Sequence, residues 1–213
     1  MSAVDLVIFD CDGVLVDSEV VAVRVMQRIL ADVGWVISID EIVERFVGGS
    51  KDNFTAQVSE YLQRPLAPDW SAQYSPWYDE AFQRDLRPVA GIEKAIDALN
   101  IPSCVASNSS HNRVRSSLCL TGLLDRFEGR IFSAQDVEHA KPAPDIYLAV
   151  ARRMDVAPDR CVVVEDSKFG VQAARAAGMS VLGYAGGLTP AAWLEGESTT
   201  IFTSMDDLVA LIG

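Results

Sequence analysis

The sequence is poor in cysteine, histidine and basic residues. Its 213 residues include four cysteines, two histidines and 18 Lys and Arg, against 30 Asp and Glu, so the formal net charge is −12. The cysteines lie far apart, at Cys11, Cys104, Cys119 and Cys161. This spacing lacks the close pairs of a zinc site and the density of a disulfide framework, so we expect reduced thiols.

The excess of acidic residues limits the partners that we expect. A surface of this charge repels the phosphates of nucleic acids and anionic lipid headgroups, and the sequence contains no basic cluster that would offset the repulsion. We therefore expect no nucleic-acid or membrane partner, and a small molecule as the ligand.

Long apolar runs are also missing. No run approaches the length of about 18 residues that a membrane span needs, and the N-terminal segment lacks the basic region that opens a secretory signal. We expect a cytoplasmic protein that is a monomer or a weak homo-oligomer.

What the chain does contain is typical of a globular protein, with 49% hydrophobic and 23% charged residues. Short apolar runs recur along it, as in strands that are buried on both faces. They predict strands at residues 4–9, 103–107, 130–133, 161–164, 180–184 and 199–202. Because helical patterns alternate with these runs, the expected fold class is α/β, a doubly wound parallel sheet with right-handed crossovers.

One interval interrupts this alternation. Between residues 18 and 87 the pattern is helical, with stretches at 19–33, 39–46, 51–63 and 69–82 and no convincing strand. The chain is about 1.4 times as long as a typical domain of about 150 residues, which fits a core with an insert. We predict a core domain of residues 1–17 and 88–213 and an α-helical cap domain of residues 18–87.

In open α/β sheets, ligands bind beyond the carboxyl ends of the strands, so the residues that follow each strand are informative. Asp10 and Asp12 follow the first apolar run, and Gly13 permits a tight turn after them. Two carboxylates this close need a metal ion or a shared proton. The alternative is a turn that caps a helix.

Three further strand ends carry polar residues. The second run ends in Ser107 followed by Asn108, either as a plain helix cap or as a hydroxyl and amides offered to an anion. Lys141 stands in the rigid segment KPAPD, either as a surface lysine or as a fixed cation. Glu165 and Asp166 close the run CVVV, although Asp166 or Ser167 would also suit a helix cap.

Together these residues indicate one kind of chemistry. Clustered carboxylates suit Mg²⁺, which prefers hard oxygen ligands, and a lysine with a hydroxyl beside them suits a phosphoryl group. A carboxylate that remains free can attack phosphorus, while a second acid transfers protons.

Four motifs in order also carry a family resemblance. The first is FDCDGVLVDSE at residues 9–19, the second is Ser107, the third is Lys141 in KPAPD, and the fourth is Glu165-Asp166 in VEDSKFGVQAARAAG. On these motifs the chain resembles the haloacid dehalogenase superfamily, in the branch with a helical cap that includes β-phosphoglucomutase and many small-molecule phosphatases. It is also similar to bacterial sugar-phosphate phosphatases of the 6-phosphogluconate type.

The resemblance implies roles for the core residues. Asp10 would be the nucleophile and a magnesium ligand, and Asp12 the general acid and base, with its backbone carbonyl on the metal. Ser107, with Asn108, would bind the transferring phosphoryl group, and Lys141 would neutralise that group and orient Asp10.

The resemblance also implies metal and cap residues. Asp166 would bind Mg²⁺, with Glu165 acting on the ion directly or through water. In the segment at residues 46–52, Gly48 and Lys51 are similar to a substrate-specificity loop that brings a basic residue onto the substrate. The alternative for Lys51 is a solvated lysine that opens a helix.

Departures from relatives narrow the expected reaction. Haloacid dehalogenases lack the second carboxylate of the first motif, so Asp12 indicates phosphate-ester chemistry. The mutase carries a catalytic histidine in the first cap helix, whereas the histidines here are His111 and His139. We expect a Mg²⁺-dependent phosphomonoester hydrolase that acts on a small phosphorylated metabolite, with a sugar phosphate favoured, through an aspartyl phosphate; the alternative is a phosphomutase.

A signalling receiver module also combines acids, a hydroxyl and a lysine on a doubly wound sheet. The motifs of a receiver come in a different chain order, and a receiver has no helical insert after the first strand. We therefore do not favour this third hypothesis for the chain.

Overall fold

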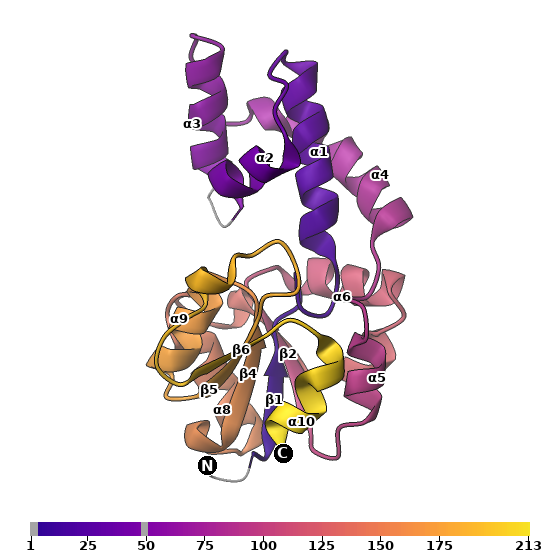
Figure 1. Cartoon of the computed structure of the whole chain (residues 1–213), viewed down its shortest axis with the longest axis vertical. Helices are drawn as coiled ribbons and strands as arrows, with labels where there is room; N and C mark the ends of the chain where they lie inside the picture. Colours follow the sequence, from indigo (N-terminus) through magenta and orange to yellow (C-terminus); the bar gives the residue numbers. More distant parts are fainter. Residues whose placement is uncertain (1–3, 48–50) are drawn as a thin grey trace. The chain divides into compact units, whose positions relative to one another are not determined.

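The structure is a computed structural model that describes residues 4–47 and 51–213. The chain divides into two compact units (Figure 1). The core unit combines the N-terminal segment up to Asp17 with Arg87–Gly213, and the cap unit is Ser18–Leu86. The boundary on return to the core thus lies one residue before the one that we predicted.

The core unit contains a six-stranded parallel sheet in the order β3-β2-β1-β4-β5-β6. The strands are β1 (Leu6–Phe9), β2 (Ser103–Ser107), β3 (Ile131–Ser133), β4 (Cys161–Glu165), β5 (Ser180–Tyr184) and β6 (Thr199–Phe202). They lie within two residues of the predicted runs, and the predicted α/β parallel sheet is confirmed.

The strand order explains where a ligand can bind. From β1 the chain builds outward through β2 to β3, and it then returns to place β4 on the other side of β1. The direction of winding therefore changes beside β1, and such a switch point leaves an opening at the carboxyl ends of the strands.

Helices cover the sheet of the core unit (Figure 1). They are α5 (Ile92–Asp97), α6 (His111–Leu120), α7 (Leu124–Phe127), α8 (Asp145–Met154), α9 (Lys168–Ala176) and α10 (Leu208–Ile212). Apolar strand residues such as Ile8 and Val163 are fully buried and form a core with helical residues such as Tyr147 and Val171. Burial on both faces is why these strands read as unbroken apolar runs.

The cap unit is helical, as its sequence pattern predicts. It consists of α1 (Ser18–Asp32), α2 (Ile39–Phe46), α3 (Lys51–Tyr61), the 3-10 helix η1 (Trp70–Tyr74) and α4 (Ser75–Asp85). A capping box of Ser38 and Glu41 opens α2. Aromatic rings pack between these elements, for example Trp35 stacked on Tyr61 at 4.6 Å between ring centroids. Ring packing thus accounts for much of the aromatic content of the insert.

Among the helices of the described ranges, none combines the length and the apolar character that a bilayer span would require.

Helix α6 offers a matched test of the core. Leu118 is fully buried, whereas Leu120 on the same helix is 46% exposed. We expect Leu118→Ala to lower the free energy of unfolding by about 2–5 kcal/mol, because it leaves a cavity, and Leu120→Ala to change it by less than about 0.5 kcal/mol. Urea unfolding followed by circular dichroism measures both, and equal effects of the two variants would contradict this packing.

Candidate active site

A buried lysine lies at the centre of the polar residues that follow the strands. Lys141 Nζ donates hydrogen bonds to Asp10 Oδ1 at 2.6 Å, to Glu165 Oε1 at 2.7 Å and to the carbonyl oxygen of Ala106 at 2.9 Å. Its side chain is 3% exposed. The surface-lysine alternative for Lys141 is therefore wrong.

Strand register explains why one ammonium group reaches these three partners. Phe9 of β1 pairs with Val105 of β2 on one side and with Val164 of β4 on the other. The next residue on each strand is Asp10, Ala106 or Glu165, so these three lie at one level across the sheet. The three N–H groups of the ammonium are matched to three acceptors.

Opposite charges keep this lysine protonated. Burial by itself acts to lower the pKa of Lys141, but the carboxylates of Asp10 and Glu165 raise it well above its usual value. A buried ammonium is tolerated only when such partners satisfy its charge and its hydrogen bonds.

Glu165 is fully buried, and both of its oxygens are already bound. Oε1 accepts from Lys141 and from the hydroxyl of Tyr147 at 3.0 Å, and Oε2 accepts from the backbone N–H and the hydroxyl of Ser167, both at 2.9 Å. Direct coordination of an ion by Glu165 would have to replace one of these bonds.

Two glycines make room for the acids of the fourth motif. A Cβ atom on Gly170 would lie 1.6 Å from Glu165 Oε1, and one on Gly13 would lie 1.9 Å from Asp166 Oδ2. Gly13 also has a φ of +80°, which side-chain-bearing residues rarely adopt. The glycine in each motif is therefore a packing requirement for a carboxylate.

The acids form a cluster with metal-binding geometry. Asp10, Glu165 and Asp166 are all buried, and each offers an oxygen within 4.8 Å of the others. Burial raises the pKa of Asp10 to about 7; Lys141 opposes this rise, and the charges of Glu165 and Asp12 add to it. A cation between Asp10 and Asp166 would relieve the repulsion, so the donor set fits a hard ion such as Mg²⁺.

The loop after β2 presents a hydroxyl. Ser107 is buried, and its Oγ accepts from the backbone N–H of Ser109 at 3.0 Å, which leaves the O–H free to donate to a ligand. The helix-cap alternative applies to Ser110 instead, whose side chain caps α6.

The side chain of Asn108 holds the segment that carries Lys141, and its substrate-binding role stays a prediction. Its side-chain amide donates to the carbonyl oxygen of Lys141 at 3.2 Å and accepts from the Lys141 backbone N–H at 3.0 Å. Both ends of the amide therefore fix the backbone of the lysine.

Two further predicted residues belong to the cap segment, and the two histidines belong to the core unit. Gly48 is outside the described residues, and Lys51 is the first residue of α3. His111 Nε2 lies 2.8 Å from Asp136 Oδ1, and His139 Nδ1 lies 3.1 Å from Asp145 Oδ1.

Sequence reasoning missed Tyr147 and Ser109, the latter of which donates its Oγ–H to Asp12 Oδ2 at 2.9 Å. Ser167 caps α9, as one alternative from the sequence predicts, and it also donates to Glu165. Ser109 follows Ser107 by two positions, which is the one signal that marks it. Tyr147 reads as an ordinary core aromatic of α8.

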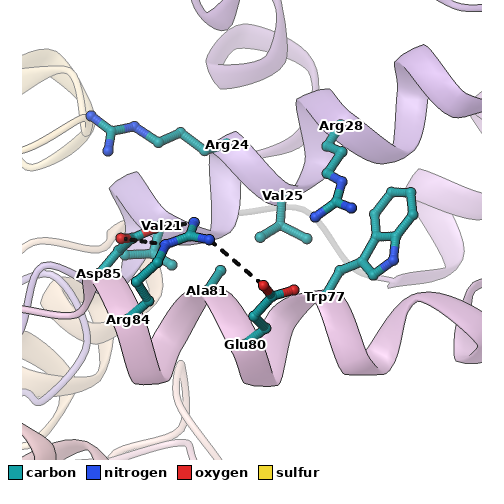
Figure 2. Close-up of a pocket in the computed structure, with 9 residues that line it drawn as sticks. All are labelled: Val21, Arg24, Val25, Arg28, Trp77, Glu80, Ala81, Arg84 and Asp85. Carbon is teal, nitrogen blue, oxygen red and sulfur yellow. Dashed lines mark hydrogen bonds and ion pairs between the residues drawn. The ribbon is translucent and has the colours of Figure 1, made fainter.

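A pocket of about 90 Å³ lies in the cap unit, between α1 and α4 (Figure 2). Among its charged residues, Arg84 pairs with Asp85 and Glu80, and the guanidinium of Arg28 lies 3.9 Å from the Trp77 ring centroid. The pocket offers no hydroxyl and no buried acid, so the candidate active site is in the core unit.

The packing of Gly170 can be tested without an activity assay. Gly170→Ala places a methyl group on a carboxylate that four hydrogen bonds hold in place, and we expect the free energy of unfolding to fall by about 1–3 kcal/mol. Gly187→Ala is the control, since a Cβ there meets nothing within 4 Å, and its effect should stay under about 0.5 kcal/mol. Chemical denaturation measures both; a harmless Gly170→Ala would show that Glu165 is not held as described.

Comparison with known proteins agrees with this geometry. The chain is 31% identical over 182 residues to 6-phosphogluconate phosphatase of Escherichia coli (strain K12), which covers 85% of this chain and 82% of that protein. A conserved haloacid dehalogenase-like protein from Agrobacterium tumefaciens has a similar structure, with a TM-score of 0.90 and 41% identity over 99% of this chain and 98% of that one.

A second solved structure is a haloacid dehalogenase family hydrolase from Deinococcus radiodurans, which was crystallised with bound phosphate and sodium. It matches with a TM-score of 0.88 and 30% identity over 100% of this chain and 96% of that one. The family model for haloacid dehalogenase-like hydrolases matches residues 4–178, a span that includes all four motifs. The expected resemblance is thereby confirmed, and the chain belongs to the haloacid dehalogenase-like hydrolase family.

Proposed function

We propose that this protein is a Mg²⁺-dependent phosphomonoester hydrolase that acts on a small phosphorylated metabolite, with Asp10 as the nucleophile. The observation that carries the proposal is the 2.6 Å bond from the buried ammonium of Lys141 to Asp10 Oδ1. This bond fixes one carboxylate oxygen at the switch point of the sheet and leaves Oδ2 for attack.

In the first half of the reaction, Asp10 Oδ2 attacks phosphorus and the bond from phosphorus to the ester oxygen breaks. Asp12 gives a proton to the departing oxygen, so the alcohol leaves neutral. Lys141 and the hydroxyl of Ser107 stabilise the charge on the phosphoryl oxygens.

In the second half, the Asp12 carboxylate takes a proton from water as the water oxygen attacks phosphorus. The bond between phosphorus and Asp10 breaks, phosphate leaves, and the carboxylate of Asp10 is restored. Each residue ends in the protonation state in which it began, so the cycle can repeat.

Asp10 and Asp166, with the backbone carbonyl of Asp12, would hold the magnesium ion, and Glu165 would act on it through water. Two observations support this ligand set: three buried carboxylates each offer an oxygen within 4.8 Å of the others, and Glu165 already accepts four hydrogen bonds. When bound, the ion supplies positive charge to the phosphoryl oxygens and keeps Asp10 ionised.

The choice of a sugar phosphate as substrate is supported by the 6-phosphogluconate phosphatase among the relatives. A net charge of −12 favours a small free metabolite over a nucleic acid or an anionic membrane as the partner. Hydrolysis is favoured over mutase chemistry because α1 contains no histidine. Gly48 and Lys51 stay predictions from the family resemblance.

The proposal predicts that the protein releases phosphate from p-nitrophenyl phosphate and from sugar phosphates, and that a chelator abolishes this activity until Mg²⁺ is added back. Asp10→Asn should lower kcat on the order of 10³-fold or more, because a neutral amide cannot attack phosphorus. Asp5→Asn, which changes a partly exposed carboxylate just before the same strand, should leave kcat unchanged. Full activity in Asp10→Asn would refute Asp10 as the nucleophile.

A further inference from the structure

The two carboxyl oxygens of Asp12 differ in their hydrogen bonding. Oδ2 accepts the Oγ–H of Ser109 at 2.9 Å. Oδ1 is buried and has no hydrogen-bond partner among the described residues. The carboxyl group is therefore fixed through Oδ2, while Oδ1 remains available for proton transfer.

Ser109 is itself held by two strands. Its backbone N–H donates to Ser107 Oγ at the end of β2, and its carbonyl oxygen accepts from Ser133 Oγ at 2.7 Å. Ser133 is fully buried at the end of β3, where it pairs in register with Ser107. The backbone of Ser109 is thus fixed on both sides, which directs its hydroxyl at Asp12.

We propose that Ser109 is a positioning residue that orients Asp12 for proton transfer; this inference rests on the proposed function. The hydrogen bond at Oδ2 fixes the plane of the carboxyl group, so Oδ1 is the atom that carries the proton to the leaving oxygen and later takes one from water. The bond suits both stages, because Oδ2 accepts from Ser109 whether Oδ1 is protonated or ionised.

Ser109 also links the two groups that the substrate meets. Its N–H occupies an acceptor position of Ser107 Oγ, which directs the Ser107 proton outward, and its own hydroxyl holds Asp12. One residue thereby sets the distance between the hydroxyl that binds the phosphoryl group and the acid that protonates the leaving oxygen. A loose acid at this position would transfer protons slowly even with substrate correctly bound.

The test compares leaving groups. An alkyl phosphate such as a sugar phosphate needs a proton on its leaving oxygen, whereas p-nitrophenolate departs without one. We expect Ser109→Ala to lower kcat/KM for the alkyl ester about 10- to 100-fold, a part of the usual contribution of a general acid. The value of kcat/KM for p-nitrophenyl phosphate should change less than about threefold.

A second readout follows the other half of the reaction. Since Asp12 is also the base for water attack, Ser109→Ala should hydrolyse the aspartyl phosphate slowly and show a rapid burst of p-nitrophenolate before the steady state. Ser109→Thr keeps the hydroxyl, and its kcat/KM for the alkyl ester should be close to that of the wild type. Ser110→Ala is the matched control, because that serine caps α6 and has no bond to Asp12, and it should behave like the wild type.

The outcomes separate the inference from the proposed function. If the wild type hydrolyses neither ester, the proposed function fails and this inference fails with it. If the wild type is active and Ser109→Ala loses kcat/KM equally on both esters, raises KM alone, or has no effect, the inference alone is overturned. In an Asp12→Asn background, Ser109→Ala should cause no further loss on the alkyl ester; an additive loss would also overturn it.

Discussion

The burial of one lysine between two carboxylates is the constraint on which the rest of the site depends. A charged ammonium inside a protein is stable only when its hydrogen bonds and its charge are satisfied, and Lys141 meets this condition through Asp10, Glu165 and the carbonyl oxygen of Ala106. The surrounding residues keep these partners in place. Tyr147 and Ser167 hold the carboxylate of Glu165, and the Asn108 side chain holds the lysine backbone.

The parallel sheet turns this local requirement into a reactive site. Adjacent strands in register present one residue each at the same level, and the switch point beside β1 keeps the space above them open. Lys141 binds one oxygen of Asp10 and so orients the other. The neighbouring loop after β2 adds two serines. Ser107 is proposed to bind the phosphoryl group, and Ser109 donates a hydrogen bond to Asp12. Fixed backbone geometry, rather than mobile side chains, therefore defines where a phosphoryl group can be transferred.

Much of this architecture could be predicted from sequence, because buried parallel strands read as apolar runs and the functional residues follow them directly. The positions of Asp10, Ser107, Lys141 and Asp166 needed only that pattern and the family motifs. The contacts made by Asn108 could not be predicted in this way. A side-chain amide can face the substrate or the neighbouring loop, and the choice depends on how the segments after β2 and β3 lie together. The hydrogen bond of Ser109 to Asp12 depends on the same packing and has no periodic signal in the sequence.

The central claim is that Asp10, oriented by Lys141, carries the phosphoryl group. Rapid acid quench of the enzyme during turnover of p-nitrophenyl phosphate, followed by proteolysis and mass spectrometry, tests it most directly. The account predicts one added phosphoryl group on the peptide that contains Asp10, localised to that residue and absent in Asp10→Asn. A phosphoryl group on another residue, or turnover in the Asp10→Asn variant at the wild-type rate, would contradict it.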